Sequence, residues 1–347
     1  MRRYDYSFIK DLRVGTGTLS LTNRIETSRV KQREMRNDHP DAFAALESIA
    51  RVQSVKGSNA IEGIVTTDKR IEDIVNRNSA PLNHDEMEIA GYRDVLNLIH
   101  NEYESLDVGE EFLLNIHRAM MAYTPQGGGS YKRRDNVIIS IDEQGVRSVR
   151  FKPVSHEEAP ESTRQAILAY MDAKDDAGID PLILIPCFIL DFLCIHPFSD
   201  GNGRISRLLT LLLMYKNGID VGKYISFEGQ INEHKDRYYE SLRRSSESWH
   251  TNDNDYVPFI ENFILTLFTC FKELDRRFET VGDKKVNKGN RIEALIRGSI
   301  VPISKKEIEE LLPDVSRTTI ESKLAELQKQ GRIVKTGSYK DARYVWR

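Results

Sequence analysis

A chain of 347 residues is longer than a single hydrophobic core usually extends, so two or three domains are expected. Hydrophobic residues make up 39% and charged residues 30% of the composition, which excludes a wholly disordered chain. The net charge of −3 excludes a uniformly basic nucleic-acid-binding protein, although residues 284–347 carry 15 Lys and Arg against 8 Asp and Glu. Such a local excess of positive charge indicates a separate C-terminal module.

Apolar residues at helical spacing predict that most of the chain is helical. Along residues 41–55 they recur at three-residue steps and form one apolar face, made of Phe43, Leu46, Ile49 and Val52. The same periodicity predicts helices over 86–102, 110–121, 162–173, 182–195, 204–216, 232–246 and 257–280. We therefore expect a mainly α-helical fold.

One region departs from the helical pattern. Residues 136–141 and 146–151 are short β-branched runs on either side of Asp142-Glu143-Gln144-Gly145, which is typical of a β-hairpin. An isolated hairpin is only marginally stable, so we expect it to lie over another part of the protein. Two interpretations are open, a flap over a binding site or a simple connector.

The stretch at 181–198 is the most apolar of the chain. Asp191 and three prolines interrupt it, and it is shorter than the ~20 apolar residues of a membrane-spanning helix. The N-terminal sequence MRRYDYSFIK has no apolar signal-peptide core. The three cysteines, Cys187, Cys194 and Cys270, lack paired metal spacing, so buried thiols in a reducing compartment are expected. We expect a cytoplasmic protein with no membrane contact.

The C-terminal part shows a second pattern after a polar linker at 282–290. Helices are predicted over 291–297, 304–312 and 316–330, and strands over 332–336 and 344–346. Ser304 and Glu307 have the spacing of a capping box, and Pro313-Asp314 predicts a turn. This order of elements is typical of a winged-helix domain.

Two kinds of partner are open for this module. Basic residues on its third helix and hairpin are able to contact DNA phosphates, namely Arg317, Lys323, Lys329, Lys335, Lys340 and Arg343. Glu321 and Glu326 lie on the same helix, and winged helices also dock proteins. DNA binding through 284–347 is therefore the less favoured of the two interpretations.

The residues with the clearest chemistry are 196–207. A helix is predicted from Arg204, and Gly201 and Gly203 before it leave backbone N–H groups unobstructed. Such a helix start is an anion site that suits phosphate. Arg204 and Arg207 lie three residues apart on this helix, and guanidinium groups suit phosphate oxygens.

Two further side chains complete this set. Asp200 offers a single hard oxygen ligand, which suits Mg²⁺ held jointly with substrate phosphates. His196 titrates near neutrality and is able to accept a proton from an attacking hydroxyl. Each feature alone is more often structural, but their grouping within twelve consecutive residues predicts phosphoryl or nucleotidyl transfer.

The sequence HPFSDGNGR at 196–204 resembles the signature of the Fic family, HPFx[DE]GN[GK]R, with no departure. The resemblance covers roughly residues 82–271. It implies a helical Fic-type core with a β-hairpin flap, and transfer of AMP from Mg-ATP to a Ser, Thr or Tyr hydroxyl of a protein, including the enzyme itself. It also implies His196 as the general base and Asp200 as the Mg²⁺ ligand. The ATP-binding residues that it implies are Asp200, Gly201, Asn202, Gly203, Arg204, Ser206, Arg207, Ile139, Ser140, Tyr238 and Tyr239.

The resemblance also implies how these groups divide the nucleotide. The loop glycines and Asn202 cradle the α- and β-phosphates, Arg204 holds the β-phosphate and Arg207 holds the γ-phosphate. Tyr238 and Tyr239 resemble a tyrosine pair near the adenine pocket, with aromatic core packing as an equal alternative.

A second motif resembles the family's inhibitory pattern [ST]xxxE[GN]. It comprises Ser58-Asn59-Ala60-Ile61-Glu62-Gly63 and precedes the catalytic loop. The resemblance implies that Ser58, Glu62 and Gly63 belong to an inhibitory helix, and that Glu62 pairs with Arg207 so that ATP binds in a poor pose.

The expected organisation is therefore an N-terminal helical region at 1–81, a catalytic core at 82–280 and a linker with a winged helix at 281–347. Several alternatives stay open. Relatives on the same fold transfer phosphate or phosphocholine, or remove AMP from proteins. A DNA-binding regulator that senses a nucleotide without turnover is a further alternative, and a homodimer is possible.

Overall fold

The structure is a computed structural model that describes residues 2–141, 147–282, 288–297, 299, 302–312, 315–337 and 342–347. The predicted hairpin turn at Asp142-Glu143-Gln144-Gly145, the turn at Pro313-Asp314 and Lys340 lie outside the described residues. The N-terminal helices are α1 (Thr16–Asp38), α2 (Pro40–Ile61), α3 (Asp68–Arg77), α4 (His84–Glu102) and α5 (Glu110–Met120). The central ones are α6 (Ala159–Ala173), α7 (Pro181–Ile195), α8 (Asn202–Lys216), α9 (Phe227–Glu233), α10 (Lys235–Ser246) and α11 (Val257–Gly282).

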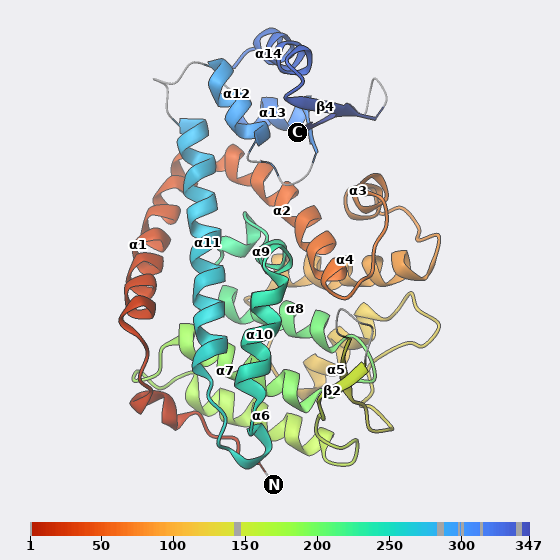
Figure 1. Cartoon of the computed structure of the whole chain (residues 1–347), viewed down its shortest axis with the longest axis vertical. Coiled ribbons are helices and arrows are strands. Elements are labelled where there is room, and N and C mark those ends of the chain that lie inside the picture. The colour runs from red at the N-terminus through yellow and green to blue at the C-terminus, as the bar shows by residue number, and fades with distance from the viewer. Residues whose placement is uncertain are drawn as a thin grey trace.

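The apolar helices α7 and α8 form the centre of the molecule, and α11 runs along its length (Figure 1). Nearly every residue of α7 is buried, which explains its unbroken apolar sequence. α1 lies along α11 on the outer side, and α2 packs on α9. This packing brings the C-terminal end of α2 to the first turn of α8.

Asp191, the acid inside the apolar stretch, has a structural explanation. Its carboxylate is 1% exposed and accepts hydrogen bonds from Tyr6 Oη at 2.9 Å, Trp249 Nε1 at 2.7 Å and Tyr256 Oη at 2.9 Å. Arg2 forms an ion pair with it at 3.1 Å. A buried charge is tolerated when it is paired and hydrogen-bonded in this way, and the cluster anchors the N-terminal segment to α7.

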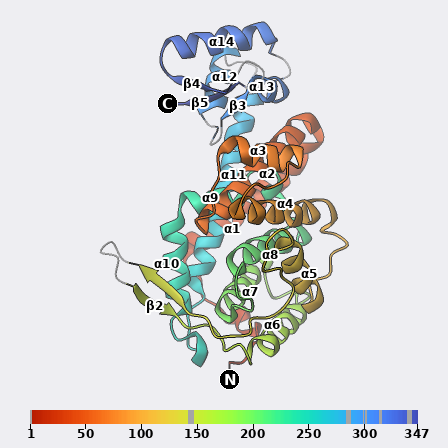
Figure 2. The same cartoon turned by 90° about the vertical axis from the view of Figure 1, so that its right-hand side faces the viewer.

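The β-hairpin consists of β1 (Ile138–Ile141) and β2 (Arg147–Phe151), which pair antiparallel. It projects from the helical core on the side of α10 (Figure 2). Ile139 pairs with Val149, and both side chains are strongly exposed, at 49% and 66%. The hairpin therefore lies over the core with one apolar face open to solvent.

The C-terminal part lies beyond the end of α11 (Figure 1). It contains α12 (Lys288–Arg297), α13 (Lys305–Leu311) and α14 (Arg317–Lys329) with strands β3 (Ile303–Ser304), β4 (Ile333–Thr336) and β5 (Arg343–Trp346). The sheet has the order β3-β5-β4 and is antiparallel. The capping box of Ser304 and Glu307 begins α13 as predicted.

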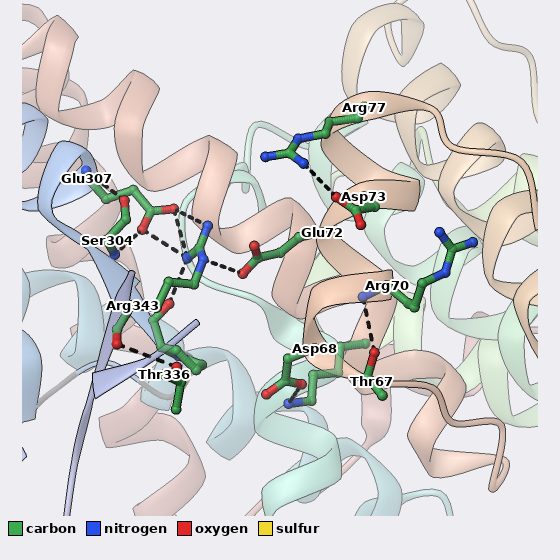
Figure 3. Close-up of polar contacts among 12 residues, drawn as sticks. Thr67, Asp68, Arg70, Glu72, Asp73, Arg77, Ser304, Glu307, Thr336 and Arg343 are labelled. Atoms are coloured by element: carbon green, nitrogen blue, oxygen red, sulfur yellow. Dashed lines mark hydrogen bonds and ion pairs between the residues drawn. The ribbon is translucent and has the colours of Figure 1, made fainter. Parts of the chain in front are cut away.

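A polar contact joins this part to the N-terminal helices (Figure 3). Arg343 on β5 lies between Glu72 of α3, at 2.8 Å from Nε, and Glu307 of α13, at 3.1 Å from Nη1. Its Nη1 also donates to the Pro302 carbonyl at 2.7 Å. The C-terminal elements thus contact the helix that directly follows the predicted inhibitory motif.

The prediction of a mainly helical fold with one β-hairpin is confirmed, and most predicted helices differ from the observed ones by a few residues at their ends. The predicted helix at 232–246 corresponds to α10, which begins after His234; α9, which ends at Glu233, was not predicted as a separate helix. α1 was not predicted, because its buried residues, Thr18, Ile25 and Gln32, are mostly polar. α3 was not predicted either, although Ile71, Ile74 and Val75 give it an apolar buried face. No helix in the described part of the chain combines the length and apolarity needed to cross a membrane.

Candidate active site

His196 caps the C-terminal end of α7 in the left-handed conformation, with φ of 54°. Its Nδ1 lies 3.3 Å from the Leu193 carbonyl, so that nitrogen carries the proton and donates. The unprotonated Nε2 is then the basic atom of the ring. Burial lowers the pKa of His196 to about 4, so the imidazole is neutral and able to accept a proton at physiological pH.

Hydrogen bonds among its own residues fix the conformation of the loop between α7 and α8. Asn202, 2% exposed, accepts a hydrogen bond from the Phe198 N–H at 2.9 Å and donates to its carbonyl at 2.8 Å. Gly201 has φ of 80°, and a Cβ there would overlap the end of Met120. Ser206 donates to the Gly203 carbonyl at 2.7 Å. The side chains of Asn202 and Ser206 therefore shape the loop and leave ligand contact to the backbone.

Arg207 is buried on the first turns of α8 and is held by the predicted inhibitory motif. Its Nε donates to Ser58 Oγ at 2.8 Å, and its Nη2 donates to the Ser58 carbonyl at 2.9 Å. Glu62 Oε1 accepts from the same Nη2 at 2.7 Å. Burial opposes the charge, but Glu62 raises the pKa of Arg207 above its ordinary value. Gly203 is essential to this arrangement, because a Cβ there would collide with the Glu62 carboxylate.

Arg204 has a different partner. Its guanidinium is 1% exposed and forms an ion pair with Glu88 of α4, although the atoms are not aligned as a hydrogen bond. Its Nη2 also lies 3.6 Å from Asp200 Oδ2. Glu88 is itself buried, and its Oε1 lies 3.0 Å from Nε2 of His84. The two arginines of α8 are therefore paired with acids from two different helices.

A cavity of about 230 Å³ opens at this point. Its walls include the predicted site residues Glu62, His196, Gly203, Arg207, Tyr238 and Tyr239. The hairpin contributes Ile138, Arg150 and Phe151, so it forms one wall of the cavity. Asp200, Gly201, Asn202, Arg204, Ser206 and Ile139 are not among the residues that line it. The cavity has an imidazole, a guanidinium and a carboxylate within one enclosed space.

The two tyrosines of α10 pack edge to face, with ring planes at 69° and ring centroids 5.4 Å apart. The guanidinium of Arg150 lies 5.0 Å from the Tyr239 ring and donates to the Tyr239 carbonyl at 2.5 Å. The hairpin is thereby tied to α10. Ile138 lines the cavity, whereas the predicted Ile139 is half exposed on the other face; the backbone of Ser140 pairs with Ser148 in the hairpin.

His117 of α5 contacts the loop between α7 and α8, and the sequence did not predict this role. Its ring stacks on Phe198 at a centroid distance of 3.8 Å. Its Nδ1 accepts from the Gly129 N–H at 3.0 Å, and its Nε2 lies 3.2 Å from the Asp200 carbonyl. Burial lowers its pKa to about 4, so it stays neutral. A single histidine on a helix gives no sequence signal for this role.

Asp200 is the residue available to a metal ion. Its carboxylate is 69% exposed, and Oδ1 accepts from the Gly201 N–H at 2.6 Å. No group of three or more His, Cys, Asp or Glu side chains with metal-binding geometry exists in the described ranges. One exposed carboxylate fits Mg²⁺ that shares its remaining ligands with a phosphate group, and does not fit a metal held by protein alone.

Part of the chain is similar in sequence to known proteins. Residues 106–214 match the Fic/DOC family. A protein adenylyltransferase Fic from Nematostella vectensis is 28% identical over 226 residues, which cover 61% of this chain and 45% of that protein. A protein adenylyltransferase fic-1 from Caenorhabditis elegans is 26% identical over 121 residues, covering 35% of this chain and 22% of that protein. The chain thus spans less than half the length of these curated relatives.

A solved structure extends the likeness of the fold to the whole chain. A Fic family protein from Desulfovibrio desulfuricans superposes with a TM-score of 0.62 over 97% of both chains, at 20% identity. This likeness concerns the fold alone, whereas the sequence match covers the loop with His196 and Arg207. Residues 106–214 are therefore similar in sequence to the Fic/DOC family, and the fold of the whole chain is similar to that of a Fic family protein.

Proposed function

We propose that the protein transfers AMP from Mg-ATP to a Ser, Thr or Tyr hydroxyl of a target protein, including itself. The observation that carries the proposal is the cavity in which His196, Gly203 and Arg207 meet beneath the hairpin. A neutral imidazole, a guanidinium and the N-terminal end of a helix are the groups that nucleotidyl transfer needs. The names of the two curated relatives support the same activity.

The residues divide the work as follows. Nε2 of His196 accepts the proton of the target hydroxyl as that oxygen attacks the α-phosphorus of ATP, and pyrophosphate leaves. The backbone of Gly201, Asn202 and Gly203 at the start of α8 binds phosphate oxygens. Arg207 holds the γ-phosphate. Asp200 would hold Mg²⁺ together with the phosphates, and the ion would neutralise charge on the leaving group.

Arg204 is proposed to favour phosphate binding through its charge, without direct contact in this structure. It is enclosed between Glu88 and Asp200 and does not reach the cavity. We propose that its charge adds to the positive potential of the helix start, and that direct contact with the β-phosphate requires Asp200 to turn toward the metal ion. Tyr238 and Tyr239 form the wall on which the adenine ring would lie, beside Ile138 and Arg150 of the hairpin.

Autoinhibition through Glu62 is part of the proposal. The Glu62 carboxylate occupies the Nη2 donor of Arg207 that a γ-phosphate requires, and Ser58 occupies the Nε donor. Nucleotide bound under these conditions loses its contact with Arg207 and is not aligned for attack. Gly63, with φ of 81°, ends the helix directly after Glu62 and lets the chain turn away.

Intact-mass spectrometry tests the activity. Glu62→Gly incubated with Mg-ATP is expected to gain the mass of AMP, and Glu62→Gly combined with His196→Ala is expected to gain none while retaining its melting temperature. A gain of phosphate mass would identify the alternative of phosphoryl transfer on the same fold. Release of AMP from a modified protein by the wild type would support the alternative of AMP removal.

The C-terminal part is proposed to be a winged-helix module that docks on protein. Three of its six predicted DNA-contacting residues are engaged by acids: Arg317 with Glu321, Lys323 with Glu293 and Glu326, and Arg343 with Glu72 and Glu307. These pairs compete with phosphate contacts. DNA binding through 284–347 stays a prediction, which a gel shift of the full chain at low salt tests; homodimerisation also stays a prediction.

A further inference from the structure

Lys132 is a buried lysine beside the catalytic loop that the reaction described above does not use. It lies in the segment that leads into β1, and it is 3% exposed. Among the described residues no carboxylate forms an ion pair with it. Burial of an ammonium group without a counter-charge costs free energy, so its presence against the chain segment that carries His196 indicates a role there.

Lys132 contacts the chain on both sides of His196. Its backbone N–H donates to the Pro197 carbonyl at 2.9 Å. Its ammonium group donates to the Ile195 carbonyl at 3.3 Å. One residue therefore holds the carbonyl groups of the two residues that flank the general base.

Asn136 extends this contact along the loop. Its Oδ1 accepts from the Lys132 ammonium group at 3.0 Å, and its Nδ2 donates to the Phe198 carbonyl at 3.4 Å. His196 has a left-handed backbone, with φ of 54°, a conformation that is unfavourable for a residue other than glycine. The contacts from Lys132 and Asn136 oppose relaxation of that conformation, and they arise from the base of the hairpin.

The charge of Lys132 also favours the neutral form of His196, which is the form able to accept a proton. Burial lowers the pKa of His196 most, the hydrogen bond to the Leu193 carbonyl opposes this, and the Lys132 ammonium lowers the pKa further against smaller opposing effects of Glu62 and Asp200. Burial lowers the pKa of Lys132 itself to about 8, and Asp135 opposes that shift. Lys132 is therefore still largely charged at neutral pH.

We propose that Lys132 is a positioning residue for the general base: it holds the carbonyls on either side of His196, and its positive charge opposes protonation of the imidazole. The inference rests on the proposed role of His196 in AMP transfer. It assigns to the hairpin base a function in setting the geometry and the charge state of the base.

The first test needs no nucleotide. NMR of imidazole-labelled histidines follows the protonation of His196 between pH 3 and pH 7 in wild type, Lys132→Met and Lys132→Arg. Lys132→Met keeps the aliphatic stem and removes the charge, so the His196 titration is expected to move up by about one pH unit. Lys132→Arg is expected to titrate like the wild type. An unchanged titration in a folded Lys132→Met protein would overturn the electrostatic half of the proposal.

The second test uses AMP transfer in the Glu62→Gly background. Lys132→Met is expected to lower kcat about tenfold at pH 7, the loss expected when a proton-accepting group loses its alignment, and to leave KM for ATP within about twofold. Lys132→Arg is expected to recover most of kcat. The control is Lys152→Met, because Lys152 is an exposed lysine of the same hairpin region.

These outcomes separate the inference from the function on which it rests. If the Glu62→Gly protein modifies nothing, the proposed activity fails while the NMR titration still decides the effect of Lys132. If transfer proceeds and Lys132→Met matches Lys152→Met in kcat and in the acid limb of the pH profile, the positioning role is wrong. If Lys132→Met does not fold, Asn136→Ala replaces it as the test, because it removes the contact to the Phe198 carbonyl. An unchanged kcat in Asn136→Ala would contradict the proposal that contacts from the hairpin base position His196.

Discussion

The two arginines at the start of α8 lie one helical turn apart and are held in different ways. Arg204 and Glu88 form a pair whose side chains are 1% and 7% exposed, whereas Glu62, the partner of Arg207, is 32% exposed. Glu88 belongs to α4 in the core of the domain, and Glu62 is the last residue of the turn that ends α2. A buried pair is costly to break, and a half-buried pair at a helix end is readily released. The difference shows which contact belongs to the framework and which suits regulation.

The largest expected effect is on the framework pair. Glu88→Gln leaves the Arg204 guanidinium buried without its full counter-charge, and we expect the free energy of unfolding to fall by about 3 kcal/mol. Urea denaturation measures this. Glu62→Gln serves as the matched control and is expected to change stability by less than about 1 kcal/mol. Equal losses in the two variants would contradict the distinction between the pairs.

Breaking the proposed regulatory pair of Glu62 and Arg207 is expected to increase activity. Glu62→Gly frees the Nη2 donor of Arg207, and self-modification is expected to rise at least about tenfold, which corresponds to about 1.4 kcal/mol. Scintillation counting of labelled AMP on the protein provides the measurement. Glu88→Gln should not increase incorporation. A rise in both variants would show that any loss of negative charge near α8 activates the enzyme.

A smaller gain is expected from the serine that shares Arg207 with Glu62. Ser58→Ala removes the hydroxyl that accepts from Nε, and we expect about a threefold rise in activity, consistent with the modest net value of one hydrogen bond. Ser54→Ala is the control, because Ser54 lies one turn earlier on α2 and contacts Ser226 instead. If Ser58→Ala loses activity, Ser58 orients Arg207 for catalysis instead of restraining it.

The smallest effect is expected where the C-terminal part meets α3. Burial, opposed by Arg343, raises the pKa of Glu72 from 4.5 to about 6. The folded state therefore binds this proton more tightly than the unfolded state, so the contribution of Glu72 to stability is largest below pH 4.5 and is lost as the pH rises through 6. Glu72→Gln should flatten the pH dependence of unfolding by at most about 0.5 kcal/mol in that window, after allowance for solvent screening. Identical pH profiles would show that Glu72 is not desolvated at the contact.

Sequence alone predicts the features of the protein that depend on short-range patterns. The apolar periodicity of α7 and the glycines around Asn202 predict a buried helix, a tight loop and a new helix start, and all three are present. The motif predicted to be inhibitory has a fixed spacing of its own, so the sequence also singles out Glu62 as a candidate. The contact of Glu62 with Arg207 joins residues far apart in the sequence, and only the family resemblance pointed to it.

The rest depends on packing that no local pattern encodes. Glu88, His117 and Lys132 are ordinary charged residues in their own segments, and they acquire roles because α4, α5 and the hairpin base meet the loop in space. The face of the hairpin was also not predictable, since an alternating strand gives two equivalent choices, and Ile138 rather than Ile139 lines the cavity. α1 was missed because its buried face is mostly polar.

The most direct measurement is a crystal structure of Glu62→Gly with Mg²⁺ and a non-hydrolysable ATP analogue, compared with wild type under the same conditions. The account predicts the phosphates on the backbone of residues 201–203, the γ-phosphate on Arg207 and the α-phosphorus within reach of His196 Nε2, with a displaced γ-phosphate in the wild type. Phosphates bound away from the start of α8, or an identical pose in both proteins, would contradict it.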